Sequence, residues 1–296
     1  PLGPMAQPAH VPVSLAQKRM WFLNQFDTSS AAYNIPLAVR LTGHLDVESL
    51  RAAVTDVFVR HESLRTVFPS HDGEPTQVVL SPGQWTPNLE ITEVSEAELR
   101  EHIAGLATAG FDVTADVPMR SALFALAPDD HVLVIVVHHI CADGFSLTPL
   151  ARDVMTAYAA RIAGSAPQWN PLSVQYADYT LWQLQLLGDE SDSESLISQQ
   201  LRYWTDQLAD LPELLQLPTD RARPVQQSFR GAQVDFTIPA DVHRALSALA
   251  RKHNSTMFMA VHAALSVLLS ALSSTEDIAV GTPIAGRGDA ALDDMV

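Results

Sequence analysis

Two adjacent histidines are the residues of this chain whose type and spacing most clearly suggest chemistry. His138 and His139 follow an apolar run at residues 132–137, and Asp143 and Gly144 come shortly after them. Such a run is typical of a strand that is buried on both faces. Because neighbouring side chains on a strand point to opposite faces, only one imidazole can enter a given cavity. We therefore expect one histidine to be functional and the other to be structural.

Three further residues of this segment have competing interpretations. Asp143 stands where a helix should begin, so we expect it to cap that helix or to pair with an arginine from elsewhere in the chain. Gly144 permits either a positive φ angle or close approach of a substrate, or it simply forms a tight turn. Ser146 has the hydroxyl of an oxyanion donor, but a role as helix cap is favoured.

Metal and disulfide chemistry are not predicted. Cys141 is the only cysteine, which excludes an intramolecular disulfide and a cysteine zinc site. Adjacent histidines on opposite faces with one aspartate supply at most two ligands, whereas a metal site needs three or more. The cysteine usage suits a reducing compartment, so we expect a cytoplasmic protein.

The charge balance argues against polyanionic partners. The chain has 296 residues, with 18 Lys and Arg against 34 Asp and Glu, for a formal net charge of −16. No basic cluster offsets this charge, so we expect neither nucleic acid nor an anionic membrane as a partner. No apolar run reaches the roughly 18 residues of a membrane span, and no signal peptide is evident.

The pattern of apolar residues predicts an α/β or α+β fold. Residues 37–41 alternate as a strand, Asp46 precedes a helical pattern at 47–58, and residues 64–68 alternate again. Further helices are expected at 96–107, from Leu150 through Tyr158, at 176–187 and at 194–208. Strands and helices in this order are typical of a layered domain.

Prolines and composition suggest where the chain divides. Residues 1–9 resemble a linker or a protease-cleavage remnant, and residues 10–187 are expected to form a first lobe. Residues 188–230 form a connecting region in which prolines interrupt regular structure, and residues 231–296 are the start of a second lobe. In the second lobe we expect strands at 234–236 and 278–280 and helices capped by Asp241 and Ser255. Two short strands cannot cover two helices, so this lobe is expected to be incomplete.

Five motifs in order resemble one family. They are SLAQKRMWFL (14–23), RHESLRTVF (60–68), HHICADG (138–144), YADYTLW (176–182) and VGTPIAGR (280–287). The chain resembles a condensation domain of a nonribosomal peptide synthetase, in the chloramphenicol-acetyltransferase-like superfamily with the signature HHxxxDG. The resemblance extends over nearly the whole chain.

The resemblance implies an acyltransferase with two acetyltransferase-like lobes in a V, the second lobe being incomplete here. It implies no cofactor of its own, because the substrates are thioesters on the 4′-phosphopantetheine arms of upstream donor and downstream acceptor carrier proteins, with an adenylation domain adjacent. Peptide-bond formation would use His139 as the catalytic histidine beside His138. Asp143 would form an ion pair with Arg287, which is favoured, or Arg65, and the Gly144 amide is a candidate oxyanion donor. Antibiotic or siderophore biosynthesis is the implied setting.

The subtype and two alternatives also follow from the resemblance. Residues 34–36 and 143–153 resemble domains that join two L-residues. Heterocyclising and oxygenase-recruiting relatives alter the double histidine, which is intact here. An epimerisation domain shares the motif, although residues 147–150 look like those of a condensation domain. A non-catalytic docking domain for carrier proteins is the second alternative.

Overall fold

A computed structural model of the chain describes residues 1–225, 231–284 and 286–296. These residues form two compact units. The first comprises Pro1–Ile197 together with the C-terminal segment that ends at Val296, and the second is Ser198–Ile284. The division thus falls ten residues after the expected end of the first lobe at 187. The last residues of the chain join the first unit, whereas the sequence suggested that they extend the second.

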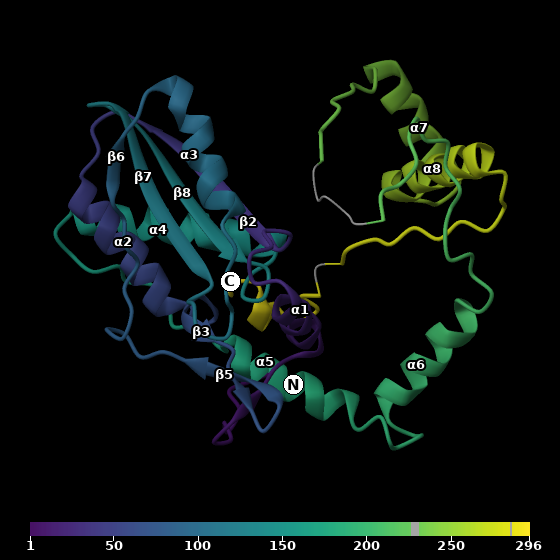
Figure 1. Cartoon of the computed structure of the whole chain (residues 1–296), viewed down its shortest axis with the longest axis horizontal. Helices are drawn as coiled ribbons and strands as arrows, with labels where there is room; N and C mark the ends of the chain where they lie inside the picture. The colour runs from purple at the N-terminus through teal and green to yellow at the C-terminus, as the bar shows by residue number, and fades with distance from the viewer. Residues whose placement is uncertain (226–230, 285) are drawn as a thin grey trace. The chain divides into compact units, whose positions relative to one another are not determined.

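The main sheet of the first unit has the strand order β2-β8-β7-β6 (Figure 1). The bounds are Asn34–Thr42 for β2, Asp130–His138 for β8, Met119–Ala127 for β7 and Ile91–Glu93 for β6. The strands β2, β8 and β7 are antiparallel, and β6 joins β7 in parallel. The combination of this sheet with packed helices confirms the predicted α/β class.

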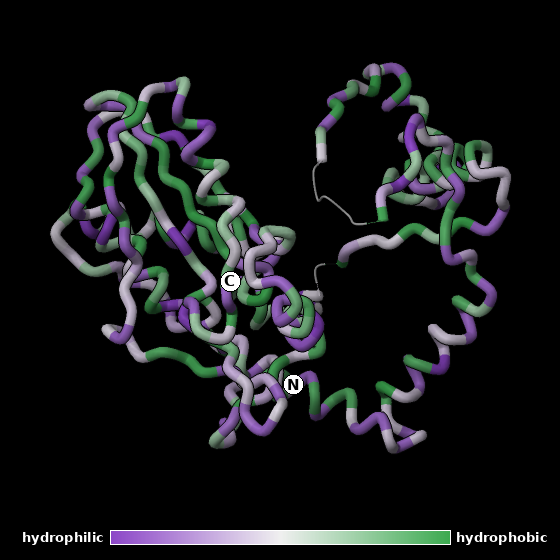
Figure 2. The backbone as a smooth tube through the Cα atoms, in the orientation of Figure 1, coloured by the Kyte–Doolittle hydropathy of each residue, from purple (hydrophilic) through white to green (hydrophobic). Residues whose placement is uncertain are grey.

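Strand β8 is the centre of this sheet and is buried on both faces. Residues 131–138 are all buried, and Val134 and Val136 have no exposed surface. In Figure 2 the tube through this strand is hydrophobic for most of its length. Burial on both sides explains why the apolar run does not alternate.

Helices cover both faces of the sheet. The helix α2 (Val47–Arg60) begins after Asp46, whose carboxylate accepts from the Ser49 amide at 2.9 Å, as predicted. It packs against α4 (Leu147–Ile162), where Arg161 forms a bidentate ion pair with Asp56 at 2.6 and 2.7 Å. The helix α3 (Glu96–Thr108) lies on the other face.

A smaller sheet combines β1 (Val11–Pro12), β5 (Glu74–Val79), β3 (Thr66–Val67) and β4 (Ser70–His71). The strand expected at 64–68 is wrong in its first half. A 3-10 helix, Glu62–Arg65, occupies that position, and only β3 follows it as strand. Leu64, Thr66 and Phe68 are nevertheless all buried. Alternation alone could not distinguish the two conformations.

Helices α1 (Leu15–Phe26) and α5 (Tyr176–Leu187) complete the first unit, and the bounds of α5 match the prediction. They flank the small sheet: the side chain of Gln77 in β5 donates to Thr180 of α5 at 3.2 Å. This arrangement brings motifs from opposite ends of the unit together.

The second unit is helical in its described residues. It contains most of α6 (Leu196–Gln207), together with α7 (Ala240–Lys252) and α8 (Met257–Ser273). The strands expected at 234–236 and 278–280 are absent from these described residues, which have no strand partner there to pair with. The predicted caps are also wrong: Pro239 and Thr256 precede the two helices, not Asp241 and Ser255.

Helix α8 has no buried residue although it is rich in apolar side chains. Among the described residues no single helix is long and apolar enough to cross a membrane, and α7 and α8, which pass that test only as a pair, are bent by 105°.

Two glycines near α3 provide a test of the packing of the first unit. A Cβ at Gly110 would overlap the carbonyl oxygen of Thr28 and the backbone of Ser29, whereas Gly105 within α3 faces open space. We expect Gly110→Ala to lower the free energy of unfolding by about 1–3 kcal/mol. Gly105→Ala should raise it by about 0.5–1 kcal/mol, because alanine favours the helix. Urea unfolding of both variants measures these changes, and a Gly110→Ala protein as stable as wild type would contradict the close packing.

Candidate active site

The first histidine of the pair ends β8 inside the protein. The side chain of His138 is 1% exposed, and its Nδ1 accepts a hydrogen bond from the Ile140 amide at 3.1 Å. The rings of Tyr33 and Phe111 lie against it. Burial, followed by nearby positive charge, lowers the pKa of His138 to about 4. The imidazole is therefore neutral near pH 7 and is held as part of the core.

The second histidine faces a cavity. The strand has ended at His139, whose backbone amide donates to the Tyr33 carbonyl at 2.7 Å and whose side chain is exposed. A cavity of about 230 Å³ lies beside it, and its lining includes Tyr176 and Arg287. Residues from both ends of the first unit therefore surround His139.

Asp143 and Ser146 form a reciprocal cap at the start of the next helical segment. The Asp143 carboxylate accepts from the amide and the hydroxyl of Ser146, each at 2.8 Å, and the Ser146 oxygen accepts from the Asp143 amide at 3.0 Å. The Ser146 hydroxyl proton is thus used within the cap, which disfavours its role as an oxyanion donor. The same carboxylate also has an ionic partner.

That partner is Arg287, from the segment at residues 286–296, which we call the C-terminal strap. Its Nη2 lies 3.4 Å from Oδ1 of Asp143 and 3.1 Å from Oγ of Ser146. The alternative, Arg65, does not contact Asp143. Its guanidinium donates to the Leu80 carbonyl and lies 3.3 Å from the Glu62 carboxylate. Asp143 lies in the connection between β8 and α4 and is therefore close to the strap, whereas Arg65 faces β5.

Gly144 is exposed and leaves free space at its Cα, because a Cβ there would meet nothing within 4 Å. Its φ is not positive, so the backbone does not require glycine. The structure thus leaves room for close approach of a substrate at this position.

Cys141 is not a candidate nucleophile. Its side chain is 4% exposed, and Sγ lies 3.1 Å from the His138 carbonyl, to which the thiol donates. Burial raises the pKa of Cys141 to about 12, which keeps it as a thiol near neutral pH. Among the described residues no three His, Cys, Asp or Glu side chains gather as a metal site would require.

Three residues of the site were missed by reasoning from single residue types. Gln17 is 2% exposed; its Nε2 donates to the Ile140 carbonyl at 3.2 Å, and its Oε1 accepts from the Ser14 amide at 3.0 Å. The Ser14 hydroxyl is 3.0 Å from that of Tyr176, and burial raises the pKa of Tyr176 to about 12. A glutamine on the buried face of an amphipathic helix was the available signal, since such a group needs partners.

A family model described as the condensation domain matches residues 7–296. The chain belongs to the condensation domain family. The protein is a condensation domain of the type found in nonribosomal peptide synthetases, because one of its relatives is named as such a synthase.

Two bacterial relatives illustrate the similarity. The condensation domain is 49% identical, over 100% of its length, to isonitrile lipopeptide synthase of Mycobacterium tuberculosis. It is 47% identical, over 98% of its length, to a dimodular nonribosomal peptide synthase of Bacillus subtilis. The chain spans only 12% of the length of each of these proteins.

Solved structures agree with this fold. The X-domain from teicoplanin biosynthesis has a TM-score of 0.91 and 35% identity, covering 100% of this condensation domain and 65% of that chain. The first condensation domain of the CDA synthetase, 20% identical with a TM-score of 0.73, covers 98% of this chain and 68% of that one, and supports the fold alone.

The buried state of His138 predicts a pH dependence of stability. Its pKa of about 4 is below the value of 6.5 for free histidine, so between these pH values the unfolded chain binds a proton that the folded chain does not. Stability should therefore fall as the pH decreases through this window, by up to about 3 kcal/mol from this group.

His138→Asn keeps an acceptor for the Ile140 amide but cannot titrate, so its stability should fall less between pH 6.5 and 4. Urea unfolding at several pH values measures the difference, and contributions from other buried groups cancel between the two proteins. Parallel curves for wild type and variant would show that His138 is not held neutral by burial.

Proposed function

We propose that this condensation domain forms a peptide bond between two carrier-bound substrates, with His139 as the catalytic residue. The observation that carries the proposal is the exposure of His139 to a cavity directly after the buried strand β8. His138, one residue earlier, is enclosed by the core and cannot reach the same space.

The reaction is aminolysis of a thioester. The amine of the acceptor aminoacyl group attacks the carbonyl carbon of the donor thioester, a C–N bond forms and the C–S bond breaks. The donor phosphopantetheine leaves as a thiolate, which finally takes up the proton that the amine has lost. An α-amino group titrates near ~7.7–8.0, so a sizeable fraction is neutral at cellular pH. His139 takes the proton that the attacking nitrogen loses, or accepts its hydrogen bond and orients it.

Asp143 and Arg287 support this geometry and do not react. The Asp143 side chain is 36% exposed and that of Arg287 14%, so their ion pair is expected to contribute about 1 kcal/mol or less to stability. The role of this ion pair is to hold the segment that follows His139 in place. The Gly144 amide remains the candidate donor to the oxyanion, since the space beside it is open.

The substrates in this proposal arrive on upstream donor and downstream acceptor carrier proteins, with an adenylation domain adjacent in the same synthetase. The relative named as a dimodular nonribosomal peptide synthase supports this setting, and so does the intact HHICADG segment. We further propose that the domain joins two L-residues, in a cytoplasmic synthetase that makes an antibiotic- or siderophore-like peptide. The domain itself holds no cofactor in this scheme.

A non-catalytic docking role is the second candidate. The similarity to the teicoplanin X-domain favours it, because that domain also has a solved structure in complex with OxyB. The intact double histidine favours catalysis, since relatives that recruit oxygenases disrupt this motif. An epimerisation domain shares the motif, and the product of the reaction distinguishes it.

Replacing the proposed catalytic residue tests the assignment. His139→Ala should lower the single-turnover rate of peptide formation by about 10²- to 10⁴-fold, the usual contribution of a positioned acid or base. Its melting temperature should stay close to that of wild type, because the side chain is exposed. His243→Ala, at an exposed position of α7, is the matched control and should react at the wild-type rate. A folded His139→Ala protein with a near-normal rate would contradict the assignment.

Carrier dependence is a separate prediction. The chain has a net charge of −16 and no glycine-rich phosphate loop, so it offers no evident site for the nucleotide of an acyl-coenzyme A. We expect turnover with aminoacyl groups on phosphopantetheinylated carriers, with no further requirement for ATP or metal ions. Rates are to be compared at equal low concentrations of aminoacyl-carrier and aminoacyl-coenzyme A. Equal rates would mean that the carrier proteins contribute no binding energy.

A further inference from the structure

The C-terminal strap carries one end of the ion pair at the site, and Arg287 organises the strap itself. Its Nη1 donates to the carbonyls of Leu292 and Met295, each at 2.6 Å. Its Nη2 contacts Asp143 and Ser146. One guanidinium therefore folds the strap and joins it to the segment that follows His139.

The far end of the strap is held by His61, which directly follows α2, and by Ser63 of the 3-10 helix Glu62–Arg65. The amide of Val296 donates to Nδ1 of His61 at 3.3 Å, and its carbonyl accepts from the Ser63 hydroxyl at 3.0 Å. His61 has no exposed surface, and Ser63 and Val296 are 5% and 2% exposed. Both backbone polar groups of Val296 are thus satisfied by buried side chains.

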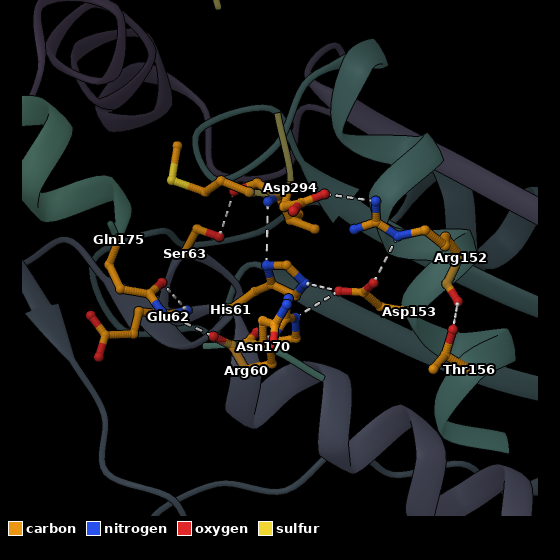
Figure 3. A network of polar contacts seen from close by, with 12 residues as sticks. Arg60, His61, Glu62, Ser63, Arg152, Asp153, Thr156, Asn170, Gln175 and Asp294 are labelled. Carbon is orange, nitrogen blue, oxygen red and sulfur yellow. Dashed lines mark hydrogen bonds and ion pairs between the residues drawn. The ribbon is translucent and has the colours of Figure 1, made fainter. Parts of the chain in front are cut away.

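The second nitrogen of His61 is fixed by a buried carboxylate (Figure 3). Nε2 lies 2.9 Å from Oδ2 of Asp153, which also receives Nε of Arg60 at 2.8 Å. Although burial alone would raise the pKa of Asp153, its hydrogen bond with His61 and the neighbouring cations lower it. Because an ionised carboxylate only accepts, Nε2 carries the proton and Nδ1 is free to accept from Val296.

The charges around His61 keep this tautomer in place. Arg152 of α4 connects Oδ1 of Asp153 at 3.1 Å with the strap residue Asp294 at 2.7 Å (Figure 3). Burial, with the positive charges of Arg60 and Arg152, outweighs Asp153 and lowers the pKa of His61. A neutral imidazole is the state that can accept from the Val296 amide.

We propose that His61 is a positioning residue for the reaction, which holds the strap through Val296 and so keeps Arg287 against Asp143 beside His139. The inference rests on the proposed function for its effect on rate, but not for its effect on the strap. His61 does not line the cavity and does not touch the reacting groups.

Two substitutions separate the roles of the two ring nitrogens. The amide oxygen of His61→Asn lies near the position of Nδ1 and can accept from Val296. The amide nitrogen of His61→Gln lies near Nε2 and can donate to Asp153, but this variant leaves Val296 without its acceptor. Hydrogen exchange of peptides covering residues 287–296, together with the single-turnover rate, is to be measured on the full-length protein.

We expect His61→Gln to speed exchange of the strap about 10-fold and to lower the rate constant of peptide formation by a similar factor, with exchange in β7 and β8 unchanged. His61→Asn should retain most of the wild-type exchange protection of the strap and most of the wild-type rate. The proposal would be overturned if both variants lost exchange protection of the strap and reaction rate to the same extent. It would also be overturned if the strap of His61→Gln exchanged at the wild-type rate. If the wild-type protein made no peptide, the exchange pattern would still test whether His61 holds the strap. Failure of the proposed function and failure of this inference are therefore distinguishable.

Ser63→Ala covers the case in which neither histidine variant folds. The substitution removes only a hydroxyl, and with it the donor to the Val296 carbonyl. It should shift exchange of the strap and the rate in the same direction as His61→Gln. A folded Ser63→Ala protein with wild-type values for both would contradict the proposal.

Discussion

Burial of β8 on both faces is the constraint on which the site depends. Every residue from His131 to His138 is buried, so a shift of the strand by one residue would change which histidine lies at its buried end. The register with β2 and β7 fixes the same position through backbone hydrogen bonds. The strand therefore determines which histidine is enclosed and which one faces the cavity.

Contacts from distant parts of the chain then fix the segment after β8. Gln17 of α1 holds the Ile140 carbonyl, and Arg287 of the strap holds Asp143. The strap is in turn bound at Val296 by His61 and Ser63. Two motifs that are remote in sequence thus contact this loop directly, and a third acts through the strap. None of the three needs to touch a substrate to influence the geometry of the loop.

Much of the first unit could be predicted from the sequence because its signals are local. Asp46 before α2 and the apolar run of β8 are determined by neighbouring residues, and both are confirmed. The strands expected at 234–236 and 278–280 are wrong, because strand formation depends on a partner that local alternation cannot reveal. Likewise, the contact between His61 and Val296 joins residues 235 positions apart, and no spacing rule predicts it. The role of His139 stays a prediction.

We propose above all that the domain joins two carrier-bound substrates at the cavity beside His139. The mass of the acceptor carrier tests this proposal most directly. Donor and acceptor carriers loaded with distinct L-aminoacyl groups are to be mixed with the protein and analysed by intact-protein mass spectrometry after a single turnover. We predict that the acceptor carrier gains the mass of the donor residue. An acceptor of unchanged mass, with or without an inverted α-carbon, would contradict it.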